Sequence, residues 1–291
     1  MEQIIQFVLS GLSQGGIYAL IAIGFYMMWS ATHAANFTHG DIFMLGAVST
    51  VVLAEVGVPL LLAMPLGIAI SAIAGALIER IAVRPFNHGP SSIGWMLTTI
   101  AIGLMLESAL TATYGPLGRP LYSPLAQQPI RIGGSGVYPQ ELLIPAVALL
   151  LMVLLDLFYR HTILGRVMLA VAANPTAAGL MGINVNRIAL IAYAMAGAVG
   201  AIGGILIAPV SEASSSMGAL VGLKAFVVAI VAGISNARGV VIVALGYGIL
   251  EKFIEGYIST AARNSIGFAI LILLLLAFPN GIFGKREVSK V

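Results

Sequence analysis

Nine apolar runs, separated by short breaks of glycine, proline and charged residues, make up most of this sequence. They lie near residues 4–29, 36–56, 58–82, 91–113, 140–160, 187–208, 219–236, 239–258 and 264–280. A helix needs about 20 mostly apolar residues to cross a bilayer, and most runs have about that length. We therefore expect an all-α, polytopic membrane protein with about eight or nine transmembrane helices, forming one domain over residues 1–291.

The composition excludes a water-soluble domain. Only 9% of the 291 residues are charged and 59% are hydrophobic, whereas about a quarter of a soluble domain is charged. A transmembrane β-strand alternates polar and apolar residues, but residues 266–278 are continuously apolar. The net charge of +3 comes from residues at the ends of runs, so we expect a lipid bilayer as partner and no nucleic acid. The first run has no basic segment before it and is expected to stay in the mature protein.

Basic residues fall unevenly on the two sides that alternating runs define. If the C-terminal tail is cytoplasmic, nine basic residues lie inside: Arg80, Arg84, Arg160, Arg166, Arg187, Arg238, Lys285, Arg286 and Lys290. Five lie on or near the outer side: Arg119, Arg131, Lys224, Lys252 and Arg263. Because cytoplasmic loops are rich in Lys and Arg, we expect a cytoplasmic C-terminus. Nine crossings then place the N-terminus outside, unless a broken or re-entrant segment near residues 31–41 changes the count.

Two segments suggest an internal repeat. Residues 40–57 and 222–239 are apolar, equal in length and bounded by glycines, and the orientation rule gives them opposite directions. An inverted-topology repeat produces such a pair, and transporters built this way bind substrate between the repeats near interrupted helices. We expect approximate halves at residues 1–139 and 140–291. The alternative is a chance likeness in a chain with 34 glycines.

Small residues recur at every fourth position in two runs. One set is Gly67, Ser71 and Gly75, and the other is Ala196, Gly200 and Gly204. Such faces allow helices to approach closely. They predict close helix contacts, either inside one bundle or between subunits.

The sequence lacks the motifs of several catalytic and binding classes. It contains no cysteine and no G-x-x-x-x-G-K-[ST] phosphate loop, so any ATP and Mg²⁺ used in transport are expected to bind to other subunits. Residues 11–15 match G-x-S-x-G, but a nucleophilic serine needs a strand-to-helix turn and these residues lie in an apolar run. The four histidines, His33, His39, His88 and His161, lack zinc-ligand spacing, and we expect them in loops or at helix ends. No catalytic residue, metal site or cofactor is predicted in this chain.

A polar segment begins the second run. Asn36, Thr38, His39 and Asp41 surround Phe37 and Gly40. One interpretation is an unwound segment that lines a cavity, because charged groups at membrane depth are commonly functional. The other is a helix cap at the interface, with Thr38 or Asn36 as the cap and Asp41 near the positive end of the helix dipole.

Three other places carry charge within the runs. Glu107 lies deep in its run and is expected to be a buried carboxylate satisfied by a neighbouring helix, or part of a functional site. Lys224 is expected to extend to the outer interface. The segment from Glu251 to Glu255 is expected to form a solvated helix end.

The longest polar interruption, residues 160–187, is predicted to form two short amphipathic helices on the cytoplasmic side. Pro175 would occupy the first position of the second helix after Asn174, and Gly182 would end it. Apolar residues exposed on such a loop indicate a docking partner. Since only Arg166 inside the loop is basic, we expect that partner to be a protein.

Four segments together resemble the permease subunits of branched-chain amino-acid ABC importers, of the LivH type. They are NFTHGDIFMLGA (36–47), ERIAVRPF (79–86), GRVMLAVAANPTAAGLMGIN (165–184) and GLKAFVVAIVAGISNARG (222–239). The resemblance continues to the closing GIFGKREV and covers nearly the whole chain in order.

The resemblance implies a bacterial inner-membrane subunit that works by alternating access with a second related permease, two cytoplasmic ATPases and an extracytoplasmic substrate-binding protein. It implies that a coupling loop docks on the ATPase, at positions Gly165, Arg166, Ala170, Asn174, Pro175, Ala178, Gly182 and Ile183. Leu169 and Gly179 depart from residues common in the family. Gln14, Asn36, Thr38, His39 and Asp41 are the candidate pathway or gate positions.

Other functions remain open at this point. Relatives of this type also serve other amino acids, urea and short amides as substrates. A stand-alone secondary carrier or channel for small polar solutes would need no ATPase, and an intramembrane enzyme would depend on Ser13.

Overall fold

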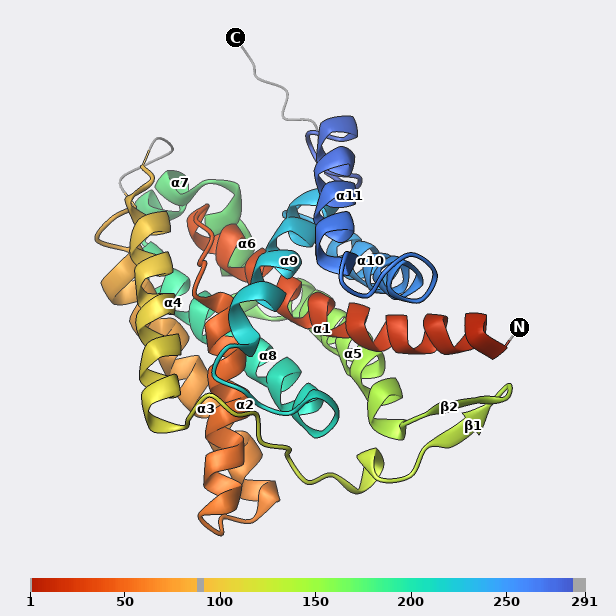
Figure 1. Cartoon of the computed structure of the whole chain (residues 1–291). Coiled ribbons are helices and arrows are strands. Elements are labelled where there is room, and N and C mark those ends of the chain that lie inside the picture. The colour runs from red at the N-terminus through yellow and green to blue at the C-terminus, as the bar shows by residue number, and fades with distance from the viewer. Residues whose placement is uncertain (1, 88–91, 285–291) are drawn as a thin grey trace.

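The computed structural model describes residues 2–87 and 92–284 and is almost entirely helical (Figure 1). The helices are α1 (Glu2–Thr32), α2 (His39–Glu55), α3 (Leu60–Ile78), α4 (Gly94–Thr113), α5 (Pro139–His161), α6 (Ile163–Ala173), α7 (Pro175–Leu180), α8 (Val185–Ser211), α9 (Met217–Ala232), α10 (Ala237–Tyr257) and α11 (Arg263–Ala277). A π-turn, η1 (Glu79–Val83), extends α3, and a short 3-10 helix, η2 (Pro124–Ala126), precedes an antiparallel hairpin of β1 (Ile130–Ile132) and β2 (Ser135–Val137). The fold is therefore all-α, as the apolar runs predict.

Each of the nine predicted runs corresponds to one helix. Among the described residues, five segments are long and apolar enough to cross a membrane by length and composition: α1, α3 with η1, α4, α5 and α8. Helices α2, α9 and α11 are shorter, with 17, 16 and 15 residues. Helix α10 is long but carries Arg238, Glu251, Lys252 and Glu255. At 1.5 Å per residue, α2 and α9 measure about 25 Å, less than the roughly 30 Å of a hydrocarbon core.

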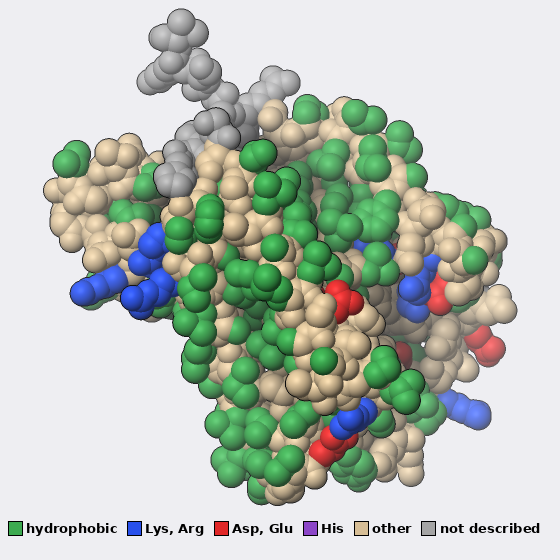
Figure 2. All heavy atoms as spheres, turned by 60° about the vertical axis from the view of Figure 1, so that its left-hand side comes forward, with side chains coloured by type: hydrophobic (Ala, Val, Ile, Leu, Met, Phe, Trp, Pro, Cys, Tyr) green, Lys and Arg blue, Asp and Glu red, His purple; other side chains and the backbone are tan. Residues whose placement is uncertain are grey.

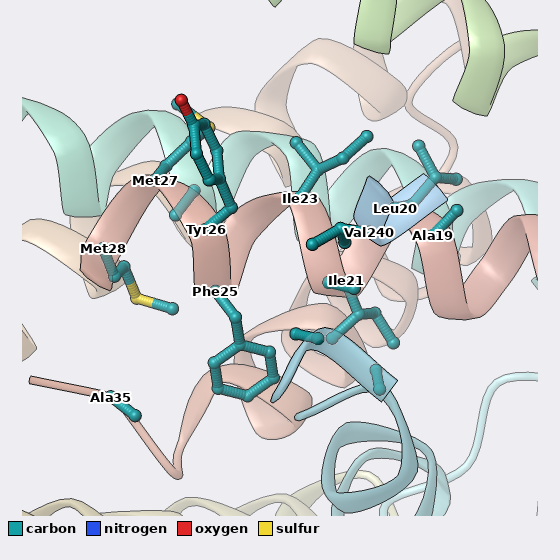
Figure 3. Close-up of a cluster of buried hydrophobic side chains, with 14 of the residues drawn as sticks. Ala19, Leu20, Ile21, Ile23, Phe25, Tyr26, Met27, Met28, Ala35 and Val240 are labelled. Carbon is teal, nitrogen blue, oxygen red and sulfur yellow. The ribbon is translucent and has the colours of Figure 1, made fainter. Parts of the chain in front are cut away.

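Helix α1 is the centre of the bundle and runs across the middle of Figure 1. Its second half is buried on nearly every side, from Gly15 to Met28. Figure 3 shows its side chains pointing to several sides, with Phe25 and Tyr26 on opposite faces. Helices α5, α8, α9 and α10 surround it. A helix that is apolar all round fits this central position.

Glycines allow the helices to approach closely. The predicted G-x-S-x-G pattern lies within the continuous helix α1, where Gly11 and Gly15 contact the α10 backbone at Ile249 and Leu245. Its glycines therefore serve helix packing, and the strand-to-helix turn of a nucleophilic serine is not formed there.

The two predicted small-residue faces also contact helices of the same chain. On α3, Ser71 and Gly75 contact α8 at Gly197 and Tyr193. On α8, Gly200 and Gly204 contact α2 at His39 and Phe43. These faces are contacts inside one bundle, which decides between the two interpretations that the sequence left open.

Helices α6 and α7 and the β1–β2 hairpin lie near opposite ends of α1. Gln6 and the Glu2 carbonyl, at the start of α1, bond to Gly136 and Ser135 of the hairpin. Helix α6 packs near the other end of α1. Arg160 and Arg238 both pair with Asp156, near α6. The hairpin and the α6–α7 segment therefore lie at opposite ends of the bundle, as expected if the predicted crossings alternate in direction. His88, Lys285, Arg286 and Lys290 lie outside the described residues.

The outer surface of the bundle is largely hydrophobic. Figure 2 shows hydrophobic side chains over much of one face, with Lys, Arg, Asp and Glu in a few groups. Leu61, Leu66, Ile73 and Leu77 of α3 and Leu104 of α4 are all exposed. Lipid covers such a surface in a membrane, because an exposed apolar belt of this size is not stable in water.

Candidate functional site

The α1–α2 connector, residues 33–38, turns back into the bundle. His39, the first residue of α2, contacts Gly24, eight residues before the end of α1. Asn36, Thr38 and His39 are completely buried. Helix α2 therefore begins inside the protein, which corrects the interpretation of this segment as a cap at the membrane interface.

The connector is held by hydrogen bonds to itself and to α4. The Asn36 Oδ1 accepts the Thr38 N–H at 3.0 Å. The Thr38 Oγ1 donates to the Thr99 carbonyl at 2.5 Å, and the Phe37 N–H donates to the Thr99 Oγ1 at 3.3 Å. Thr38 stands at the N-cap position of α2 but makes no side-chain cap bond, so the predicted Thr38 cap is wrong. The Thr38 hydroxyl instead forms a hydrogen bond to the backbone of α4.

A second connector, residues 212–216, leads from α8 into α9 in a similar way. Ser215 is buried, and its Oγ accepts a hydrogen bond from Thr111 of α4 at 2.9 Å. Helix α4 is thus bonded to the first connector through Thr99 and to the second through Thr111.

The starts of α2 and α9 meet at glycines. An ideal Cβ at Gly222 would lie 2.6 Å from the Gly40 Cα, and one at Gly218 would lie 2.8 Å from the Gly40 carbonyl carbon. No side chain fits between the helices there. Two short helices thus begin next to each other inside the bundle, and both connectors are tied to α4.

A cavity of about 290 Å³ lies beside this meeting point and opens to the surface of the bundle, where Leu104 and Leu223 are 61% and 44% exposed. Its walls come from α1, the first connector, α2, α4 and α9: Phe25, Phe37, Asp41, Ile100, Gly103, Leu104, Glu107, Ala219, Gly222, Leu223 and Phe226. The Phe226 ring lies 5.1 Å from the Phe25 ring and 4.9 Å from the Phe37 ring, between centroids. Two carboxylates and three aromatic rings therefore share one small space.

The two carboxylates come from different helices. Asp41 is 5% exposed, and a Cβ at Gly103 of α4 would lie 2.5 Å from its Oδ2. Glu107 follows Gly103 by four residues and is on the same face of α4. Within residues 2–87 and 92–284, neither carboxylate forms an ion pair with Lys, Arg or His. Glu107 is therefore not satisfied by a basic residue of a neighbouring described helix.

The predicted pathway residues are only partly brought together. Asp41 lines the cavity. Asn36, Thr38 and His39 are buried but do not line the cavity. The His39 ring meets the Phe25 ring edge-on, with 5.0 Å between the ring centroids. Neither nitrogen of the His39 ring has a hydrogen-bond partner among the described residues. Gln14 lies ten residues before Gly24 on α1, about 15 Å along the helix, and does not line the cavity.

Sequence reasoning missed the aromatic wall of the cavity. Phe25 and Phe226 lie in apolar runs. In such a run the sequence pattern does not distinguish a phenylalanine that faces a cavity from one that faces lipid. Phe37 stands out in the sequence only as part of the polar segment.

A buried ion pair lies elsewhere, where α1, α9, α10 and α11 meet. The Lys224 ammonium pairs with the Glu251 carboxylate, and these side chains are 2% and 1% exposed. Tyr18 donates its hydroxyl to Glu251, and Lys224 also donates to the Asn264 Oδ1 at 2.8 Å. Lys224 thus does not extend to the interface, because buried partners satisfy it inside the bundle.

Only the outer part of this charged group resembles the predicted solvated helix end. Glu255 pairs with Lys252 and with Arg263, each at 2.9 Å, and these three side chains are about a quarter to a third exposed. Glu251 belongs to the buried pair, which corrects the prediction of a solvated end for that residue.

The segment from 160 to 187 forms the two predicted short helices. In α6, the Thr162 Oγ1 accepts the Gly165 N–H at 2.9 Å. In α7, the Asn174 Oδ1 accepts the Ala177 N–H at 2.9 Å, with Pro175 at the first position. Gly182, with φ at +85°, follows the last turn. The two helices show the predicted capping pattern.

One side of α6 and α7 is buried and the other is exposed. Gly165, Met168, Val171 and Ala178 are buried, while Leu180 and Met181 are 87% and 70% exposed. Arg166, Asn174 and Gly182 are also exposed, whereas Ala170, Pro175 and Ile183 are half-buried. The exposed pair of apolar residues marks a surface that no other described residue of the chain covers.

Two short helices that begin inside a bundle of apolar helices, beside a cavity, are a feature found in membrane transport proteins. The family model described as branched-chain amino acid transport system / permease component matches residues 7–277. The chain belongs to this family of multi-pass membrane permeases.

Individual relatives cover nearly the whole chain. It is 32% identical to the high-affinity branched-chain amino acid transport system permease protein LivH of Escherichia coli strain K12, over 99% of this chain and 97% of that protein. It is 30% identical to the corresponding protein BraD of Pseudomonas aeruginosa, over 99% and 98%. It is also 28% identical to the ribose import permease protein RbsC of E. coli K12, over 92% and 84%.

Proposed function

We propose that this chain is the membrane-spanning subunit of a binding-protein-dependent ABC importer that carries branched-chain amino acids inward by alternating access. The family match over residues 7–277 is the observation that supports it most. The substrate proposal rests on the names of the relatives that cover 97% and 98% of their own lengths. Other amino acids, urea and short amides are the alternative substrates. The name of the ribose permease shows that similar chains serve other solutes.

The proposed complex contains a second permease of the same family, two cytoplasmic ATPases that bind ATP and Mg²⁺, and an extracytoplasmic binding protein. The C-terminus would lie in the cytoplasm of a bacterial cell, on the side of α6 and α7. The helix contacts support a repeat of halves 1–139 and 140–291 in which α8, α9 and α10 correspond to α1, α2 and α3. Under this correspondence the contact of α1 with α10 matches that of α8 with α3, and the contact of α1 with α9 matches that of α8 with α2.

The exposed surface of α6 and α7 is the proposed ATPase contact. We expect the double variant Leu180→Asp, Met181→Asp to insert and fold normally, because both side chains are exposed. Two carboxylates in an apolar contact would be desolvated without partners, so the ATPases should no longer co-purify. The measurement is the amount of ATPase recovered with the tagged permease complex.

The matched control is Val56→Asp, Leu117→Asp. These apolar side chains are 79% and 78% exposed, outside the helix bounds of α2 and α4 and away from α6 and α7. The control should retain the ATPases. Equal recovery of ATPase with both double variants would show that α6 and α7 are not the contact.

A further inference from the structure

The cavity beside Asp41 contains two carboxyl groups, the buried one of Asp41 and the half-buried one of Glu107, and no described Lys, Arg or His pairs with either. The Asp41 residue is 5% exposed and lines the cavity, and no other described residue forms an ion pair with it. Glu107 lines the same cavity one helical turn beyond Gly103, which touches the Asp41 carboxylate. Buried charges in proteins are normally paired. A cationic group placed between the two carboxylates would supply the missing charge.

The other walls of the cavity are apolar. The Phe226 ring packs against both Phe25 and Phe37, and Leu104 and Leu223 are among the other apolar lining residues. Aromatic faces attract an ammonium group and also bury aliphatic carbon. The volume of about 290 Å³ is at the lower end of ligand pockets, which measure roughly 300–1,000 Å³. These walls suit a small molecule that has both a cationic and an aliphatic part.

The start of α9 supplies the opposite polarity. Ala219, in its first turn, lines the cavity. The first N–H groups of a helix have no intrahelical acceptor, and the helix dipole places partial positive charge there. Interrupted helices of transporters direct such ends toward anionic groups of their substrates.

We infer that this cavity binds the transported substrate as a zwitterion on its passage through the membrane. The substrate ammonium group lies at Asp41 and Glu107, its carboxylate lies at the first turn of α9, and its aliphatic side chain lies against Phe25, Phe37 and Phe226. The inference rests on the proposed function and makes it more specific. The permease itself recognises the α-amino acid group, which sugars and urea lack.

The first test uses the complete importer in proteoliposomes, with both permeases, the ATPases and the binding protein. The variants are Asp41→Asn and Glu107→Gln, and the control is Glu55→Gln, an exposed carboxylate that pairs with Arg119. Each cavity variant should lower ATP-driven uptake of radiolabelled leucine by about tenfold or more, equivalent to about 1.4 kcal/mol or more. ATPase co-purification should remain unchanged and the control should retain the wild-type rate.

Failure of the inference differs from failure of the proposed function. If the wild-type importer accumulates leucine and both cavity variants keep the rate of the Glu55→Gln control, the cavity is not a substrate site. If the wild-type importer accumulates no branched-chain amino acid, the proposed function itself is wrong.

A second test does not depend on the transport rate. Because the chain contains no cysteine, Leu223→Cys in the cavity and Leu117→Cys, exposed outside it, each provide a single thiol in the permease. The second permease would be made cysteine-free. Leucine, with ATP and the binding protein present, should slow the modification of Cys at position 223 by a small cationic thiol reagent several-fold and leave position 117 unaffected. Equal rates with and without leucine at position 223 would contradict the inference.

Discussion

Lys224→Met should destabilise the protein by about 3–5 kcal/mol, because it leaves Glu251 as a buried charge without its main partner. Glu251 is 1% exposed, and its remaining contacts are the Tyr18 hydroxyl and, at 3.5 Å, Arg263. The free energy of unfolding in mixed detergent micelles is the measurement. The control is Lys252→Met, whose pair with Glu255 is about a quarter exposed. It should cost no more than about 1 kcal/mol.

The double variant Lys224→Met, Glu251→Met separates the pair from the packing around it. Removing both charges together leaves neither one unpaired, so much of the lost stability should return. The free energy lost by the double variant is compared with the sum of the losses in Lys224→Met and Glu251→Met measured singly. If the two values are equal, the charges do not stabilise each other and the buried pair does not have the role given to it here.

Gly218→Leu should destabilise the protein by about 1–3 kcal/mol and reduce the yield of folded complex, because its side chain has no space between α2 and α9. A Cβ added at this position would lie 2.8 Å from the Gly40 carbonyl carbon, which is backbone and cannot rotate away. Unfolding in mixed micelles and recovery of monodisperse protein give the measurement.

The control for Gly218→Leu is Gly246→Leu. Gly246 is also helical, in α10, and a Cβ there meets nothing within 4 Å. The control should therefore fold with near wild-type yield. Similar losses for both variants would mean that the effect comes from replacing a helical glycine in general, and that the contact between the two helix starts is looser than the structure indicates.

The sequence predicts the helices well, since their physical cause is local. Apolar runs near 20 residues produced helices at each of the nine predicted places, and Asn174, Pro175 and Gly182 define the short helices α6 and α7 because caps act over a few residues. The small residues on α3 and α8 likewise predicted close contacts, although only the structure shows which helices meet there.

The sequence could not predict which distant side chains meet. Lys224 and Glu251 are 27 residues apart and look like two charges near helix ends, until packing places them together inside the bundle. The cavity draws its walls from α1, α2, α4, α9 and a connector, so its shape depends on the whole fold. The depth of His39 also depends on the path of residues 33–38 back along α1, which no periodicity encodes.

Uptake by the purified complex in proteoliposomes is the decisive measurement of the proposed transport function. The complex would be isolated through a tag on this chain in mild detergent, and its stoichiometric companions identified by mass spectrometry before reconstitution. We expect to find a second permease and two ATPases, and to observe accumulation of a branched-chain amino acid only when both ATP and the binding protein are present. Uptake by this chain alone that persists without ATP and follows an imposed ion gradient would contradict it and identify a secondary carrier.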